Sequence, residues 1–210
     1  MSKKYIIGLV LSIATLSVLQ SQIKFKAGVN VGGQFSSLRG FDFEPNENFQ
    51  LGPTVGVYLE LGLNSKISIV TGINFERWKL KRDIAYYDGY GRNIGIENTE
   101  GYDFYNIPLL FRYKFGKNND FFVEGGAFMN YFNKGRPNGV MSLFIVFEDY
   151  NFGPALGVGK IFTLNDKFDV ALQLRNEFGL TNVNKYETWV SGNNILSNTI
   201  RLTASFSYTL

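Results

Sequence analysis

The stretch TIRLTASFSYTL, residues 199–210, alternates apolar and polar side chains up to its last residue. Neighbouring side chains of a β-strand point to opposite faces, so the pattern predicts a strand that is apolar on one side only. The apolar face carries Ile200, Leu202, Ala204, Phe206, Tyr208 and Leu210, and the polar face carries Arg201, Thr203, Ser205, Ser207 and Thr209. Such an apolar face packs either on a second sheet, as in a sandwich, or against lipid.

Other segments of the chain show the same period of two. They lie at 23–35, 53–63, 66–78, 104–115, 121–131, 150–162 and 167–180. After the amino-terminal region, no segment has the 3.6-residue period of an amphipathic helix. The sequence therefore predicts an all-β fold of eight strands.

The joins between these strands alternate in length. Short turns lie at 64–66, 116–120 and 163–167, and long joins lie at 37–50, 80–101, 132–149 and 181–198. A Greek-key sandwich would not alternate so regularly. The pattern predicts an eight-stranded antiparallel up-and-down transmembrane β-barrel with short periplasmic turns and long extracellular loops. An even strand count places both termini in the periplasm and lets the last strand pair with the first.

The amino-terminal segment has the composition of a secretory signal peptide. Lys3 and Lys4 precede the apolar run YIIGLVLSIATLSVL, residues 5–19. This run is shorter than the ~20 apolar residues of a membrane-spanning helix. We expect residues 1–21 to be removed, which leaves 22–210 as a single outer-membrane β-barrel domain. The chain has no Cys, so it can neither carry a lipid on a thiol nor form a disulfide.

Charged residues of both signs fall on the predicted non-lipid faces. If the apolar faces point outward, eight charged side chains point into the barrel: Glu60, Glu76, Arg112, Lys114, Glu124, Arg175, Glu177 and Arg201. A closed interior has to pair its charges, and an eight-stranded barrel is narrow enough to be filled by side chains. We therefore expect a polar plug. A small-solute pore would need an open lumen, and a secreted soluble lipocalin-like barrel would turn its apolar faces inward around an apolar ligand.

Aromatic residues and one proline add two local expectations. Aromatic side chains near strand ends suit girdles at the two membrane interfaces. They are Tyr105, Tyr113, Phe115, Tyr131, Phe178 and Tyr208. Pro108 lies in the middle of a predicted strand, where it removes a ladder hydrogen bond, and it predicts a β-bulge there.

Four segments together resemble one family. They are NIPLLFRYKF (106–115), VEGGAF (123–128), FGPALGVGK (152–160) and RNEFGLTNV (175–183). In this order they resemble the PorT-type outer-membrane β-barrel domain family of Gram-negative bacteria, over nearly the whole mature chain. The resemblance implies an eight-stranded barrel among outer-membrane lipids, with no catalytic residues, and some relatives are associated with protein secretion. It also implies that the barrel assembly machinery reads the terminus formed by Phe206, Tyr208 and Leu210.

The residue inventory argues against catalysis and against cofactors. The chain has no His and no Cys, so it cannot build Ser-His-Asp or Cys-His arrangements. Glu60 and Glu76 could act as paired carboxylates of a glycosidase, but a plugged barrel would deny substrate access. Asp42, Glu44 and Glu47 form an acidic loop tip rather than a calcium site. We therefore expect a protein that is not an enzyme and holds no metal.

The long loops are the candidate places for a partner. The segment IAYYDGYGRNIG, residues 84–95, offers Tyr86, Tyr87, Tyr90 and Arg92 for contact with protein or glycan, or for packing within the loop. The apolar run VMSLFIVFEDY, residues 140–150, either extends the neighbouring strands or docks a partner. With 21 Lys and Arg against 18 Asp and Glu, scattered along the chain, no basic stripe predicts nucleic-acid binding. The partner could be a secretion complex or a surface ligand.

Overall fold

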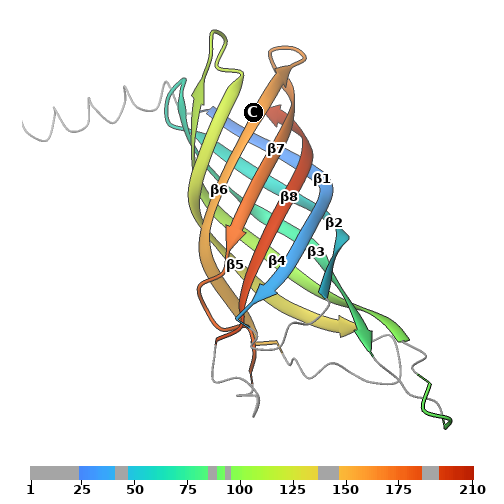
Figure 1. Ribbon diagram of the computed structural model, residues 1–210. Coiled ribbons are helices and arrows are strands. Elements are labelled where there is room, and N and C mark those ends of the chain that lie inside the picture. Colours follow the sequence, from blue (N-terminus) through green and yellow to red (C-terminus); the bar gives the residue numbers. More distant parts are fainter. Residues whose placement is uncertain (1–23, 41–46, 85–88, 93–95, 137–146, 186–193) are drawn as a thin grey trace, which may run out of the picture.

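The protein is a closed barrel of eight antiparallel strands, each paired with its neighbours in chain order (Figure 1). The computed structural model describes residues 24–40, 47–84, 89–92, 96–136, 147–185 and 194–210. The strands are β1 Lys24–Arg39, β2 Glu47–Gly62, β3 Ile67–Ile84, β4 Ile96–Phe115, β5 Phe121–Arg136, β6 Tyr150–Thr163, β7 Phe168–Phe178 and β8 Leu196–Thr209. The fold predicted from alternation is confirmed.

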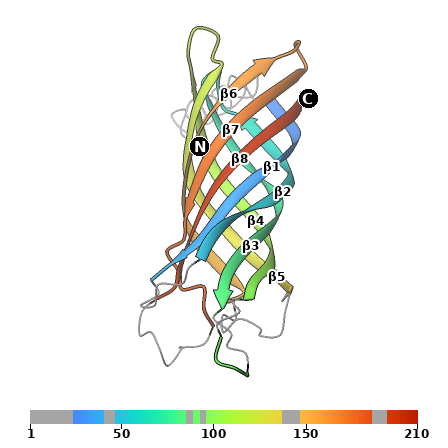
Figure 2. The same ribbon diagram turned by 45° about the vertical axis from the view of Figure 1, so that its right-hand side comes forward.

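The barrel closes between its first and last strands. β1 pairs with β8 from Lys26↔Thr209 to Arg39↔Leu196, which leaves no free sheet edge. Figures 1 and 2 show that β1 begins and β8 finishes on the side of the barrel that carries the short turns. We call this the turn end, and we call the opposite end, where the longer connections lie, the loop end. Within the described residues, no helix is long and apolar enough to cross a membrane.

Two of the short turns share one design. The Asn64 side-chain oxygen accepts hydrogen bonds from the backbone N–H groups of Lys66 (2.8 Å) and Ile67 (2.8 Å). Asn165 does the same for Lys167 (2.9 Å) and Phe168 (2.9 Å). An Asn side chain that bonds to backbone two residues on mimics a turn of the main chain. The β4–β5 turn instead uses Gly116, whose φ of 92° suits glycine.

Several strands are longer than the sequence predicted. The join expected at 80–101 is strand at both of its ends, because β3 continues to Ile84 and β4 begins at Ile96. The alternation signal stops where outward residues become polar, but backbone pairing does not need lipid-facing apolar residues. The β3–β4 hairpin therefore extends beyond the ~9–11 residues that a strand needs to cross a bilayer.

The β-bulge predicted at Pro108 is wrong. The β3–β4 ladder omits a short stretch beside Pro108, but it keeps one register on both sides, with Thr71↔Leu109 and Asn74↔Asn106. The Thr71 hydroxyl donates a hydrogen bond of 2.9 Å to the Pro108 carbonyl, so a side chain serves this carbonyl where the ladder is interrupted. Register shifts occur elsewhere, between Gln50 and Thr54 and between Asp103 and Phe104.

Candidate functional site

The lumen holds the eight charged side chains that the sequence assigned to it. They come from six strands and are buried or half-buried: Glu60 (β2), Glu76 (β3), Arg112 and Lys114 (β4), Glu124 (β5), Arg175 and Glu177 (β7), and Arg201 (β8). Each lies on the face opposite to the apolar outer wall, because side chains alternate along a strand. The alternation that turns the apolar side chains outward therefore turns all eight charged side chains into the lumen.

The half of the lumen nearer the turn end is paired around two carboxylates. Lys114 forms an ion pair with Glu60, and Arg112 Nη1 lies 2.9 Å from Glu60 Oε2. The same guanidinium reaches across to Glu124, with Nη2 at 2.8 Å and Nε at 3.1 Å from Oε2. Gln173 donates a further hydrogen bond to Glu124. Both carboxylates are thus held by more than one donor.

Ion pairs continue toward the loop end. Arg175 Nη1 lies 3.9 Å from Glu124 Oε1, and its Nε lies 3.4 Å from Glu177 Oε1. Arg201 Nη1 lies 3.0 Å from Glu177 Oε1, and Arg201 also pairs with Glu76. All eight residues therefore join one chain of alternating sign, in the order Lys114, Glu60, Arg112, Glu124, Arg175, Glu177, Arg201 and Glu76. We call it the charge chain.

Neutral amides complete the charge chain on its loop-end side. Asn106 donates to Glu177 Oε2 at 2.9 Å and to Asn130 Oδ1 at 2.7 Å, and it accepts from Asn74 at 3.1 Å. A buried ion pair is favourable only where hydrogen bonds also satisfy its remaining lone pairs and protons. The lumen meets this condition at Glu177 with an amide as well as two guanidinium groups.

Beyond the charge chain, toward the loop end, the lumen holds an apolar core. This core consists of Trp78, Tyr102, Phe104, Phe147, Val183 and Ile195, with Leu38 and Phe132 packed against it. We call this set the aromatic cluster. Trp78 links the two layers, because its indole N–H donates to Glu76 Oε2 at 3.3 Å. The Phe147 ring lies 4.6 Å from that of Tyr102 and 5.3 Å from that of Phe104, measured between centroids.

The sequence reasoning missed the aromatic cluster. Trp78 and Phe104 share inward faces with predicted lumen residues, which was the available signal. Phe147 lies in the apolar run at 140–150, but its place in the barrel depends on a connection folding back inward. Phe147 also forms an isolated β-bridge with Asn184, which ties two connections together. The rest of that run, up to residue 146, lies outside the described residues.

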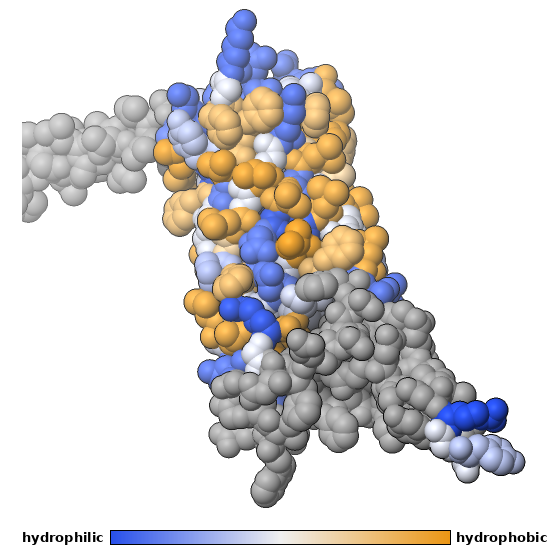
Figure 3. All heavy atoms as spheres, in the orientation of Figure 1, coloured by the Kyte–Doolittle hydropathy of each residue, from blue (hydrophilic) through white to orange (hydrophobic). Residues whose placement is uncertain are grey.

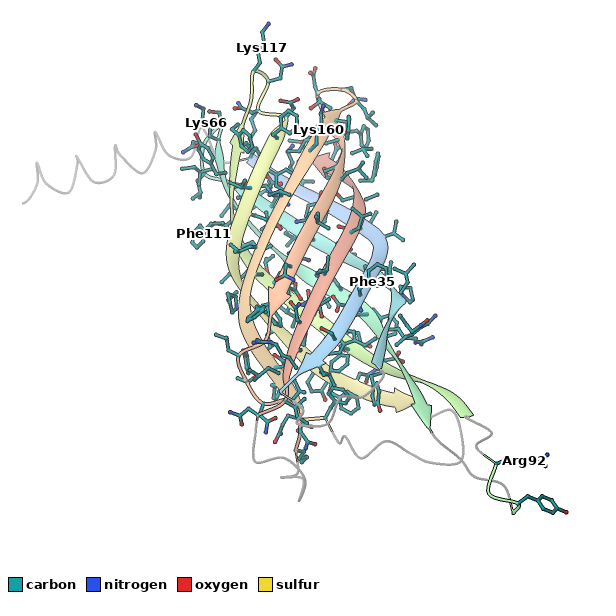
Figure 4. The ribbon with its side chains drawn as sticks, viewed as in Figure 1. Phe35, Lys66, Arg92, Phe111, Lys117 and Lys160 are labelled. Atoms are coloured by element: carbon teal, nitrogen blue, oxygen red, sulfur yellow. The ribbon has the colours of Figure 1, made fainter. Side chains whose placement is uncertain are left out.

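The outer wall is apolar between the two ends. Orange, apolar residues dominate the barrel wall seen in Figure 3, with narrower polar patches among them. Phe35 and Phe111 point away from the barrel in Figure 4, and they are 45% and 61% exposed. The predicted girdle residues Tyr105, Tyr113, Phe115, Tyr131, Phe178 and Tyr208 are all exposed large side chains. This pattern is the reverse of a lipocalin-like barrel, whose apolar faces point inward.

Two spaces lie along the described part of the lumen, one among the polar side chains of its middle and one at the turn end. A cavity of about 30 Å³ is lined by polar groups that include Asn30, Asn74 and Arg175. A vestibule of about 580 Å³ opens at the turn end and reaches Glu60 and Lys114, where the charge chain begins. Lys26 pairs with Asp169 in the wall of this vestibule. Solvent from the turn end therefore meets the charge chain first.

The candidate loop contacts are only partly described. Tyr90 is 88% exposed, and the Arg92 guanidinium lies 5.5 Å from the centroid of its ring. Figure 4 shows Arg92 far beyond the loop end of the barrel. Tyr86 and Tyr87 lie outside the described residues. So do Asp42 and Glu44 of the acidic loop tip, and the predicted signal peptide at 1–21.

The terminal residues named as an assembly signal lie on the outer wall. Phe206 and Tyr208 are 44% and 36% exposed, and Leu210 is 75% exposed. The Leu210 backbone N–H donates to the Phe25 carbonyl at 2.9 Å, which joins this end of the chain to β1.

The carboxylates considered for catalysis are held apart by their partners. Glu60 pairs with Arg112 and Lys114, whereas Glu76 pairs with Arg201. Within the described ranges, no group of three or more Asp, Glu, His or Cys could hold a metal ion.

A closed barrel with an apolar outer wall and a lumen filled by ion pairs defines a small transmembrane β-barrel protein. The family model described as "Outer membrane protein beta-barrel domain" matches residues 7–208, so the chain belongs to that family. It is an outer-membrane β-barrel protein of Gram-negative type. Among curated proteins, none matches the chain.

Solved structures show the same fold at low sequence identity. The outer membrane protein OprG from Pseudomonas aeruginosa is similar with a TM-score of 0.52 and 14% identity, over 90% of this chain and 96% of OprG. The outer membrane protein AlkL, determined in DMPC lipid bilayers, gives 0.52 and 15%, over 90% of both chains.

Proposed function

We propose that this protein is a non-enzymatic outer-membrane barrel with a closed lumen, and that its role is structural, surface contact or accessory to secretion. The observation that carries the proposal is the filling of the lumen, by the charge chain in one half and the aromatic cluster in the other. A solute would have to break ion pairs among buried side chains to pass. The absence of His and Cys from the sequence supports a role without catalysis.

Among the described residues, the β3–β4 hairpin is a feature available for surface contact. Its strands stay paired as far as Ile84↔Ile96, and Arg92, which lies beside the Tyr90 ring, stands beyond the barrel. An exposed aromatic ring beside a guanidinium suits contact with a protein or a glycan. The partner would be a secretion-complex component or a surface ligand.

Orientation and processing complete the proposal. The turn end and both termini face the periplasm, residues 1–21 are a cleaved signal peptide, and 22–210 form the barrel domain. Within the family, the motifs quoted above favour the PorT type. The barrel assembly machinery recognises the terminus that contains Phe206, Tyr208 and Leu210.

The test of a closed lumen is conductance in planar lipid bilayers. The purified protein should insert without producing stable unitary currents, because ion pairs among buried side chains fill the lumen at the charge chain. Steady single-channel steps from the folded protein would favour the second candidate, a small-solute pore, which the 580 Å³ vestibule at the turn end would serve as an entrance.

Topology is tested separately by thiol labelling, since the native chain has no Cys. Gly89→Cys in the hairpin should react with a membrane-impermeant reagent on whole cells, and Asn118→Cys in a short turn should not. The reversed result would overturn the orientation but not the closed lumen.

A further inference from the structure

The outer wall carries an apolar groove of about 720 Å³. It spans outward side chains from β8 across β1, β2 and β3 to β4, and it includes Ala27, Thr71, Ile107 and Tyr208. Ala27 pairs with Tyr208 on one side and Leu59 on the other, and Leu59 pairs with Thr71. Short side chains at Ala27 and Thr71 thus stand in a row with the larger Tyr208 and Leu59, which hollows the wall.

The groove is inclined to the membrane. At one end, Tyr208 is paired with Phe168, the first residue of β7 and the one that follows the β6–β7 turn. At the other end, Ile107 lies well inside β4, which continues to Phe115 at the turn end. The groove therefore runs from the interface at the turn end toward the middle of the apolar wall.

A cation stands at the interface end of the groove. Lys167 is exposed, and its Nζ lies 6.0 Å from the centroid of the Tyr208 ring. The backbone of Lys167 is fixed on both sides, because its N–H donates to Asn165 Oδ1 at 2.9 Å and its carbonyl accepts from Thr209 at 2.8 Å. An ammonium group beside an aromatic ring at the membrane interface attracts anionic lipid headgroups.

We propose that this groove is a binding site for a phospholipid with an anionic headgroup, with one acyl chain along Ala27 and Thr71 and the phosphate at Lys167. The site rests on the proposed orientation, which makes this lipid one of the periplasmic leaflet. Its volume lies within the ~300–1,000 Å³ of ligand pockets. A second copy of the chain is a poorer occupant, because a stable dimer buries about 1,200–2,000 Å² and the groove is confined to two adjacent rows of side chains.

The test is native mass spectrometry of the folded full-length barrel in detergent, titrated with two probes. Dioleoyl phosphatidylglycerol carries both acyl chains and a phosphate, and dioleoylglycerol carries the acyl chains alone. Ala27→Phe fills the groove and should weaken binding of both probes about tenfold, which corresponds to roughly two lost methylene contacts. Lys167→Gln should weaken phosphatidylglycerol about fivefold and leave dioleoylglycerol unchanged.

Matched controls lie outside the groove. Val123→Phe adds the same ring to an outward position of β5, and Lys117→Gln removes an exposed lysine from another turn. Neither should change binding of either probe. Each variant is first checked for the faster migration of the unheated barrel in SDS gels, so that a folding defect is recognised.

Two results would overturn the site. If Ala27→Phe binds both probes as the unchanged protein does, the acyl chain is not in the groove. If Lys167→Gln affects both probes equally, or neither, the phosphate is not at Lys167. Thiol labelling with reversed topology would contradict the proposed orientation but leave these affinities as expected, so the two failures can be told apart.

Discussion

The two halves of the lumen are closed by opposite chemistry. Toward the turn end the filling is ionic, and every member of the charge chain comes from a strand. Toward the loop end the filling is apolar, and Phe147, Val183 and Ile195 come from connections between strands. The pairing register of the strands is therefore enough to bring the members of the charge chain together. The aromatic cluster also needs connections that fold back over the end of the barrel.

The halves also differ in what a lost side chain would leave behind. A missing partner in the charge chain leaves an unpaired buried charge, which is strongly unfavourable in a low dielectric. A missing ring in the aromatic cluster leaves a cavity, whose effect depends on how far its surroundings collapse.

Arg201→Leu should give the largest effect. Arg201 is 1% exposed and pairs with both Glu76 and Glu177. Its loss leaves the buried Glu76 carboxylate without its ion-pair partner, while Glu177 keeps Arg175 and Asn106. We expect the free energy of unfolding to fall by about 3–5 kcal/mol. Urea titration of the barrel in lipid vesicles, followed by tryptophan fluorescence, measures this change. Thr203→Ser, on the same face of β8, should be nearly silent, and equal stability of the two variants would contradict the charge chain.

Phe147→Ala tests the other half. The side chain is 2% exposed and contacts several rings of the aromatic cluster, so we expect a loss of about 3 kcal/mol. Because the charge chain is untouched, the barrel should still resist SDS when unheated, while protease should cut the connections at the loop end faster. Phe152→Leu, on the outer wall, serves as the control. Loss of SDS resistance in Phe147→Ala would show that the two halves are not independent.

Thr71→Val separates the wall from the lumen. This substitution removes the hydroxyl that donates to the Pro108 carbonyl. In a bilayer no water replaces that donor, and we expect a loss of about 1 kcal/mol in the free energy of unfolding. Thr71→Ser keeps the hydroxyl and should recover most of the stability. If Val and Ser behave alike in the same urea titration, the hydroxyl does not serve the carbonyl.

Asn165→Ala should give the smallest effect. The turn loses hydrogen bonds to Lys167 and Phe168, but they are exposed and water can replace the acceptor. We expect the free energy of unfolding to fall by about 0.5–1 kcal/mol. Asn64→Ala removes the same pair of bonds from the β2–β3 turn and should give the same value within error. A large difference between the two variants would mean that the two turns contribute differently to stability although their geometry is alike.

The barrel could be predicted from the sequence because eight separate segments each show the same alternation of apolar and polar residues. The sequence also placed Arg112 and Glu124 in the lumen, since a period of two decides the face of each residue. It could not predict which charges pair, because pairing depends on the stagger between strands. Nor could it place Phe147, whose partners are far away in the chain. The bulge predicted at Pro108 was wrong because the sequence around the proline does not show that Thr71, 37 residues earlier on the neighbouring strand, donates to its carbonyl.

The route of the charge chain has a consequence for how the barrel forms. Arg201 on the last strand meets Glu76 on the third, and Arg112 on the fourth meets Glu60 on the second. Until β8 arrives, Glu76 and Glu177 lack the guanidinium that pairs with both, so a barrel that is one strand short carries excess negative charge inside. A slip of one residue in β8 would turn Arg201 out toward lipid. Closure and internal electroneutrality are therefore reached in the same step, which penalises incomplete and misregistered barrels alike.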